Sequence, residues 1–257
     1  MNKKSITSMQ NPVIKLVKEL QKKKTARKKN KLFVVEGIRA VQEIPKMIQL
    51  EKVLVSDQIE ESAYEKLNVQ EVLVVTEEIF KSISDTQTPQ GMLALVKMPE
   101  MMLEAIKIED GAYLLLENLQ DPGNLGTIIR TAHAFNFKGV FITKGSVDLY
   151  SPKVVRSTMS SLFYVPVITD YSIEEVIAFL KKAQVTLYTT ALTKTAQPIQ
   201  EVTFEKRMAL AIGNEGNGVS ENLLSQTDFT MIIPMPGGAE SLNASIAAGV
   251  CMYEMTR

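Results

Sequence analysis

The stretches MALAIGNEGNGVS, residues 208–220, and FTMIIPMPGGAESLNASIAAGV, residues 229–250, decide the fold of this chain. Each begins with a short apolar run typical of a buried strand, Met208–Ile212 in the first and Phe229–Ile233 in the second. Each run enters a loop rich in glycine, and glycine lets the backbone turn tightly and approach a ligand closely. We therefore expect a ligand site where two strands end, formed mostly by main chain.

A nucleotide-binding loop is the main rival interpretation of the first loop. Gly213, Gly216 and Gly218 follow the spacing G-x-x-G-x-G. The dinucleotide fingerprint is G-x-G-x-x-G, and a phosphate-binding P-loop needs Gly-Lys followed by Ser or Thr, so neither pattern is satisfied. Taken alone, the loop is better explained as a plain tight turn.

A third segment, ENLQDPGNLGTIIRTA at residues 117–132, lies upstream of the two loops and helps to interpret them. It resembles the Asn-x-Gly-x-x-x-Arg-x-Ala motif of the SpoU (TrmH) RNA 2'-O-ribose methyltransferases, with Asn124, Gly126 and Arg130 at its fixed positions. The two glycine-rich loops resemble the last two motifs of that family, in the same order. The resemblance implies an enzyme that uses S-adenosylmethionine, and an α/β SPOUT domain whose chain, from about Gly213, threads a deep trefoil knot.

The resemblance also implies the site residues. Arg130 is the family's usual candidate for activating the ribose hydroxyl, although the ordinary pKa of a guanidinium makes it a poor literal base, so the proton path stays open. Without the rest of the motif it would be a surface helix Arg, and Ser241 and Asn243 are equally typical caps of the last helix. The implied catalytic residues are Asn124, Arg130, Glu215, Ser241 and Asn243.

Catalysis is expected to rest mainly on holding the methyl carbon in line with the ribose hydroxyl, because the sulfonium of S-adenosylmethionine is already an excellent leaving group. The resemblance places the cofactor against the main chain around Leu192, Gly213, Ile233 and Leu242. An apolar slot for adenine between Ile233 and Leu242 makes physical sense. The alternative for these two side chains is ordinary core packing.

Composition excludes several classes of protein. The chain has 257 residues, 45% hydrophobic and 23% charged, which suits a globular protein of one large or two modest domains. No apolar run reaches the roughly 18 residues of a membrane span, so the cytoplasm is the expected location. One Cys and one His leave little for a metal site, and none is expected. Cys251 lies between Val250 and Met252, which predicts an inert core thiol.

Positive charge is concentrated near the N-terminus. The first 31 residues contain eleven Lys or Arg and one acid, Glu19, although the net charge of the chain is zero. Such a cluster suits contact with phosphates, and its alternative is a solvated, mobile tail. The family resemblance favours RNA, and it adds Arg156 as a further basic position. The predicted RNA-binding residues are Lys22, Lys23, Lys24, Arg27, Lys28, Lys29 and Arg156.

Alternating strands and helices predict two α/β domains. Residues 1–99 are expected to form a small α/β domain, and the resemblance implies that it is a ribosomal-protein-like (L30e-like) RNA substrate-binding domain. Pro99 breaks the strand pattern, so a linker is expected at 100–109. Residues 110–257 read as the methyltransferase domain with a mostly parallel sheet. In the first domain we expect a helix capped by Asn11, strands at 32–35, 53–56, 72–75 and 92–96, and helices near 38–44, 58–67 and 77–83.

The resemblance implies a homodimeric RNA ribose methyltransferase, and it implies large-subunit (23S) ribosomal RNA as the substrate because the N-terminal domain looks like that of the members that act on ribosomal RNA. The family pairs through its last helix, and the small apolar side chains of residues 244–250 permit close helix approach. One alternative is a tRNA ribose 2'-O-methyltransferase. Another is a non-catalytic RNA-binding or ribosome-assembly protein.

Overall fold

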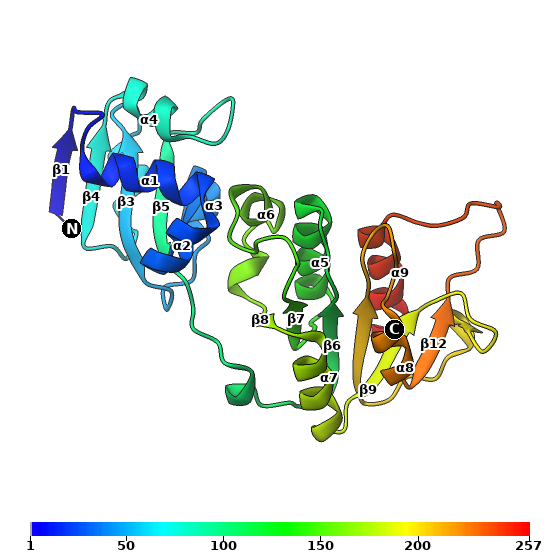
Figure 1. Ribbon diagram of the computed structural model, residues 1–257. Helices are drawn as coiled ribbons and strands as arrows, with labels where there is room; N and C mark the ends of the chain where they lie inside the picture. Colours follow the sequence, from blue (N-terminus) through cyan, green and yellow to red (C-terminus); the bar gives the residue numbers. More distant parts are fainter. Residues whose placement is uncertain (1) are drawn as a thin grey trace. The chain divides into compact units, whose positions relative to one another are not determined.

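The computed structural model describes residues 2–257, which form two compact units (Figure 1). The first unit is the chain up to Glu100 together with Tyr150–Phe163, and the second is Met101–Leu149 with Tyr164–Arg257. The sequence did not indicate that Tyr150–Phe163 groups with the first unit. Part of the expected linker is packed, because Leu103 is 4% exposed and joins the core of the second unit.

A mixed sheet of five strands forms the first unit, in the order β1-β4-β3-β5-β2. Strands β1, β4 and β3 are parallel, and β5 is antiparallel to both β3 and β2. The predicted strands are confirmed and the sequence missed β1. The strands are β1 Asn2–Ile6, β2 Leu32–Glu36, β3 Leu50–Ser56, β4 Glu71–Val75 and β5 Met92–Lys97.

The helices of this unit follow the predicted pattern with one exception. The helix expected near 58–67 is wrong, because only the short 3-10 turn η1, Glu61–Ala63, forms there. The region offers no continuous apolar stripe for the sheet to bury. The other elements are α1 Pro12–Lys22, α2 Lys24–Asn30, α3 Ile38–Gln42, α4 Glu77–Ile83, α6 Pro152–Ser157 and η3 Ser161–Phe163.

Helix α1 begins as the sequence predicts. The Asn11 side chain accepts a hydrogen bond from the backbone N–H of Val13 at 2.9 Å, and Pro12 occupies the first turn. Its buried residues are Ile14, Val17 and Leu20, which recur every three or four residues and so share one face of the helix. That face belongs to the same hydrophobic core as Val34 and Leu54 of the sheet.

The basic segment after α1 is a helix, so the interpretation as a mobile tail is wrong. The structure also corrects the prediction for Arg27, which is 4% exposed. Its Nη1 donates to the backbone carbonyls of Leu20 and, at 3.2 Å, of Gln21. Arg27 therefore satisfies carbonyls at the end of α1 and is not available to RNA phosphates.

Seven parallel strands form the sheet of the second unit, in the order β10-β12-β9-β11-β6-β7-β8 (Figure 1). The predicted parallel sheet is thereby confirmed. The strands are β6 Gly111–Leu116, β7 Gly139–Thr143, β8 Val167–Tyr171, β9 Thr186–Thr190, β10 Gln197–Pro198, β11 Arg207–Ile212 and β12 Phe229–Ile232. The helices are η2 Leu103–Ala105, α5 Pro122–Ala134, α7 Ile173–Lys182, η4 Ile199–Glu201, α8 Glu221–Gln226 and α9 Ala244–Thr256.

The strand order brings distant loops together. Strand β11 lies between β6 and β9, and β12 lies on the other side of β9. In a parallel sheet all these strands end at one edge, where the loops that leave them meet. The loops after β6, β9, β11 and β12 contain the expected motifs, so the sheet itself assembles the site.

Helix α9 carries the lone cysteine. Cys251 is fully buried, and burial raises the pKa of its thiol to about 12. The prediction of an inert core thiol is confirmed.

Among residues 2–257, no helix is both long and apolar enough to cross a membrane.

Candidate active site

Three predicted catalytic side chains form one hydrogen-bonded row in the second unit. Asn243 Nδ2 donates to Asn124 Oδ1 at 3.0 Å, and Asn124 Nδ2 donates to Glu215 Oε1 at 3.1 Å. Asn243 precedes α9, Asn124 lies in the first turn of α5, and Glu215 lies in the loop after β11. The row therefore joins the three sequence motifs, which lie far apart along the chain.

Helix α9 fixes the direction of this row. The Oδ1 of Asn243 caps α9 by accepting from the backbone N–H of Ser245 at 2.9 Å and from its hydroxyl at 2.7 Å. With Oδ1 engaged, only the Nδ2 of Asn243 is left to donate to Asn124. The other end of the Asn124 amide must then donate to the Glu215 carboxylate. Capping and participation in the site are thus one role for Asn243.

Glu215 holds the start of α5. Its carboxylate accepts from the backbone N–H groups of Gln120 at 3.0 Å and Asp121 at 2.9 Å, besides the Asn124 amide. Partial burial opposes the charged form, yet these donors together lower the pKa of Glu215 below its usual range. Glu215 is therefore a charged anchor between the loop after β11 and the N-terminal end of α5. Within residues 2–257 it forms no hydrogen bond or ion pair with Arg130.

Arg130 stands apart from the row. It lies six residues after Asn124 on α5, which turns it about 120° around the helix axis from Asn124. The side chain is exposed, and within residues 2–257 it has no hydrogen-bond or ion-pair partner. The helix itself contains no acidic residue. The five donors of the guanidinium are therefore available to a phosphate or a hydroxyl.

A cavity of about 540 Å³ opens beside the row, at the ends of β9, β11 and β12. Its volume is within the range of small-molecule sites. All four residues predicted to bind the cofactor line it: Leu192, Gly213, Ile233 and Leu242. Ser241 and Glu215 also reach its wall, whereas Arg130 and Asn124 do not. The side chain of Leu192 is 88% exposed, at the mouth of the cavity rather than in the core.

Gly213 is required for a reason that the sequence did not reveal. A Cβ at this position would lie 2.2 Å from the carbonyl carbon and oxygen of Gly218 and 2.3 Å from the nitrogen of Val219. Two backbone hydrogen bonds of 2.8 Å between Asn214 and Gly218 hold the loop closed against it. Glycine at 213 thus lets the loop fold back on itself. The sequence suggested a tight turn and close approach of a ligand, but not this backbone contact.

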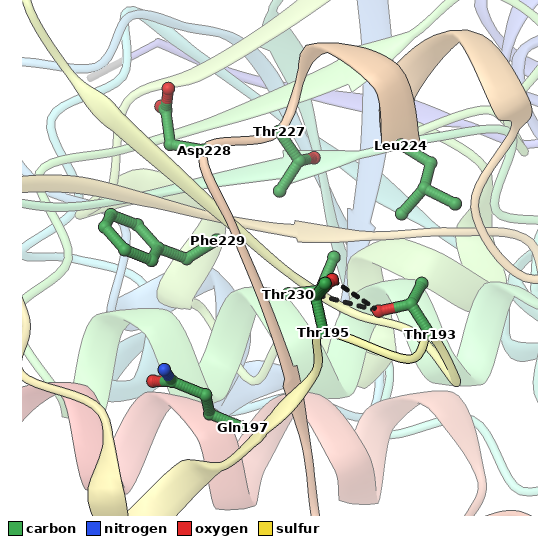
Figure 2. Close-up of a pocket in the computed structure, with 8 residues that line it drawn as sticks. All are labelled: Thr193, Thr195, Gln197, Leu224, Thr227, Asp228, Phe229 and Thr230. Carbon is green, nitrogen blue, oxygen red and sulfur yellow. Dashed lines mark hydrogen bonds between the residues drawn. The ribbon is translucent and has the colours of Figure 1, made fainter.

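A second cavity, of about 350 Å³, lies beside the first and shares Thr193 and Leu224 with it. Figure 2 shows Thr193 turned toward Thr195 and Thr230, and the hydroxyls lie 3.3 and 2.9 Å apart. These hydroxyls satisfy one another, and none of the predicted site residues lines this cavity. The glycine-rich loops and the hydrogen-bonded row therefore identify the larger cavity as the candidate cofactor site.

Two further anchors were not selected from the sequence. The carboxylate of Glu117 is 8% exposed and accepts from the backbone N–H of Ser220 at 2.8 Å and from its hydroxyl at 2.6 Å. The Gln120 amide donates to the carbonyls of Asn118 and Gly145. An acid directly after a buried strand was the available signal for Glu117. Both residues stiffen the loops that surround the site.

The predicted RNA-binding residues belong to the first unit. Lys22, Lys23, Lys24, Lys28 and Lys29 are exposed on α1, on α2 and at their junction. Arg156 is paired with Asp85 at 2.6 Å, so an RNA phosphate at Arg156 would compete with that carboxylate. No cluster of His, Cys, Asp or Glu in residues 2–257 is arranged to hold a metal ion.

Two family models match this chain. The SpoU rRNA Methylase family matches residues 111–253, and the MRM3-like substrate binding domain matches residues 11–94. The chain is 36% identical to the 23S rRNA (guanosine(2553)-2'-O)-methyltransferase RlmP of Bacillus subtilis, over 98% of this chain and 99% of that protein.

Solved structures show the same relationship. The AdoMet-bound rRNA methyltransferase from Sinorhizobium meliloti is similar with a TM-score of 0.88 and 28% identity, over 98% of this chain and 97% of that one. The SpoU methyltransferase AviRb from Streptomyces viridochromogenes, in complex with AdoMet, is similar with a TM-score of 0.87 and 27% identity, over 96% of this chain and 98% of that one. The α/β fold with its mixed and parallel sheets is therefore one already known to accommodate this cofactor.

Proposed function

The chain belongs to the SpoU rRNA Methylase family, and on that premise we propose that it transfers a methyl group from S-adenosylmethionine to a ribose 2'-hydroxyl of 23S ribosomal RNA. The observation that carries the proposal is the row Asn243–Asn124–Glu215 beside a cavity lined by both glycine-rich loops. A protein that only bound RNA would not need that cavity. Since the substrate is ribosomal RNA, the proposed place of action is the cytoplasm.

The cavity suits the cofactor on physical grounds. It combines apolar side chains, Ile233 and Leu242, with a loop of exposed main chain from Gly213 to Gly218. Apolar walls suit adenine, and backbone groups suit the ribose and the amino-acid end. The cofactor supplies an activated methyl group, so this chain has to orient the ribose and accommodate the hydroxyl proton. Arg130 is the proposed orienting residue, with its free donors directed at the hydroxyl or an adjacent phosphate.

The name of one relative indicates which nucleotide of 23S rRNA to examine first. The RlmP protein of Bacillus subtilis is named for guanosine 2553 of 23S rRNA, and this chain aligns with nearly all of it. The first ribose to examine is therefore that of the corresponding guanosine. Action on a tRNA ribose is the second candidate, and mapping both RNA classes in one experiment separates the two.

We also propose a knotted second unit and an RNA-binding first unit. The insertion of β11 between β6 and β9 supports a chain that passes back through an earlier loop, as in a trefoil knot. The match of residues 11–94 to a substrate-binding domain supports an RNA-binding, ribosomal-protein-like (L30e-like) first unit. We propose that residues 1–99 capture RNA and that residues 110–257 carry out catalysis.

We also propose a homodimer through the second unit. Ile246, Val250 and Tyr253 form an exposed stripe on α9, with exposed fractions of 55%, 36% and 51%. They recur every three or four residues, so they share one face of the helix. Sedimentation velocity at micromolar concentration should give a dimer, and Ile246→Asp should shift it toward monomer. A monomer in the unaltered protein would contradict the proposal.

The exposed lysines are expected to contribute to RNA affinity rather than to catalysis. Changing Lys22, Lys23, Lys24, Lys28 and Lys29 to Gln together should weaken RNA binding at low salt. A plot of the logarithm of the RNA association constant against the logarithm of the salt concentration has a negative slope. Each lost phosphate contact should reduce the magnitude of that slope by roughly 0.7 to 0.9. Arg27 must be kept, because its loss would leave carbonyls at the end of α1 without a donor. S-adenosylmethionine affinity should not change.

The matched control changes five exposed lysines elsewhere, Lys46, Lys66, Lys107, Lys182 and Lys194, to Gln. It removes the same formal charge but leaves the cluster intact. Equal effects of the two sets on the salt slope would mean that the cluster has no special role in RNA capture.

The proposed function is tested by mapping ribose methylation in total RNA from a strain that lacks this protein and from its parent. The loss of one 2'-O-methyl group in 23S rRNA is expected, with restoration by the unaltered protein but not by Arg130→Ala. An identical methylation map in both strains would contradict the proposal.

A further inference from the structure

Among residues 2–257, the charged side chains that line the cofactor cavity are all acidic. They are Glu215 and Glu240, and no Lys, Arg or His of this range lines it. A cavity with this lining has a negative potential inside it, which favours a cationic ligand. The two carboxylates differ in what they already bind, and this difference determines which of them can act on a ligand.

Glu215 has its charge compensated. Its oxygens accept from two backbone N–H groups at the start of α5, where the helix dipole is positive, and from Asn124. Glu240 is exposed, in the loop between β12 and α9, and has no hydrogen-bond or ion-pair partner among residues 2–257. Glu240 is therefore the one uncompensated charge on the wall of the cavity that the structure describes.

The reaction changes the charge of its cofactor. S-adenosylmethionine carries a sulfonium and an ammonium against one carboxylate, and its demethylated product has a neutral thioether in place of the sulfonium. The two molecules have nearly the same shape, so apolar packing against Ile233 and Leu242 distinguishes them poorly. An uncompensated carboxylate does distinguish them, because it attracts the cation and not the neutral product.

We propose that Glu240 sets the preference of this cavity for the cationic cofactor over its neutral product, and so promotes product release after each transfer. The inference rests on the proposed function, since it concerns the same cavity. It assigns Glu240 a specificity role separate from the catalytic row, from which it is absent.

The test compares dissociation constants, measured by calorimetry on the full chain without RNA. The ligands are S-adenosylmethionine, S-adenosylhomocysteine and sinefungin, in which a protonated amine replaces the sulfonium. Glu240→Gln should weaken both cationic ligands by about 2- to 5-fold, the range for an exposed charge pair, and leave S-adenosylhomocysteine unchanged. The effect should shrink as the Debye length falls from roughly 30 Å at 0.01 M salt to 3 Å at 1 M.

Glu205→Gln is the matched control. Glu205 is an exposed acid just before β11, and Gly213 follows the other end of that strand. At the rise of an extended strand, the two residues are separated by roughly 25 Å. It should leave all three affinities unchanged. Equal discrimination by the unaltered protein and Glu240→Gln, or an equal loss for all three ligands, would overturn the role of Glu240. No binding of S-adenosylmethionine to the unaltered protein would instead contradict the proposed function.

Discussion

Arg130→Ala is expected to slow single-turnover methyl transfer by about 10²- to 10³-fold, the typical cost of removing a donor that stabilises a transition state. Cofactor affinity should change by less than about 2-fold, because Arg130 does not line the cavity. Stability should be preserved, since the side chain is exposed and has no partner in the described part of the chain. Rate, affinity and thermal unfolding measured on one preparation separate these three effects.

Arg130→Lys and a remote cation complete that experiment. Lys keeps the positive charge but loses the planar fork of donors, so it should recover only part of the rate. Lys182→Ala removes an exposed cation at the end of α7 and should leave the rate unchanged. Full activity of Arg130→Ala at saturating RNA would show that Arg130 has no role in methyl transfer, even if the substitution weakens RNA binding.

Gly213→Ala is expected to have the second large effect. Its Cβ would overlap the backbone of Gly218 and Val219 at 2.2 to 2.3 Å, and backbone atoms cannot rotate away as a side chain can. Opening the loop would break the paired hydrogen bonds between Asn214 and Gly218 and displace Glu215 from α5. We expect a loss of about 3 kcal/mol or more in unfolding free energy, at the upper end for overpacking. S-adenosylmethionine binding should weaken at least 10-fold in the fraction that stays folded.

Two glycines serve as controls in the same loops. A Cβ at Gly216 would meet only the Asn214 side chain, at an ordinary 3.5 Å, and one at Gly237 would meet nothing within 4 Å. Both Gly216→Ala and Gly237→Ala should keep nearly full stability. Equal tolerance at all three positions would show that the first loop is looser than its hydrogen bonds indicate.

Much of the second unit was predictable because its signals are local. Buried strands such as Met208–Ile212 are short apolar runs bounded by glycine, and α7 has both an apolar stripe and a Ser172 cap. The cavity followed from the same logic, since parallel strands end at one edge. The four residues predicted for the cofactor do line one cavity, although their contact with the cofactor remains a prediction.

What the sequence could not reveal depends on distant partners. Nothing near Arg27 distinguishes it from the lysines around it, yet its guanidinium turns inward to the carbonyls that end α1. Nothing local shows that the rings of Phe33 and Tyr150 pack in a tilted arrangement, with centroids 4.8 Å apart. This is one of the contacts within the first unit, to which Tyr150–Phe163 belongs. The row from Asn243 to Glu215 likewise exists only once α5 and α9 have packed.

The most direct measurement incubates the purified chain with S-adenosylmethionine and 23S rRNA transcribed without modifications, and then maps ribose methylation nucleotide by nucleotide. The account predicts one new 2'-O-methyl group, near stoichiometric, that is absent with Arg130→Ala and needs no added metal. Methylation of a base instead of a ribose, or no methylation of 23S rRNA by a protein shown to bind the cofactor, would contradict it.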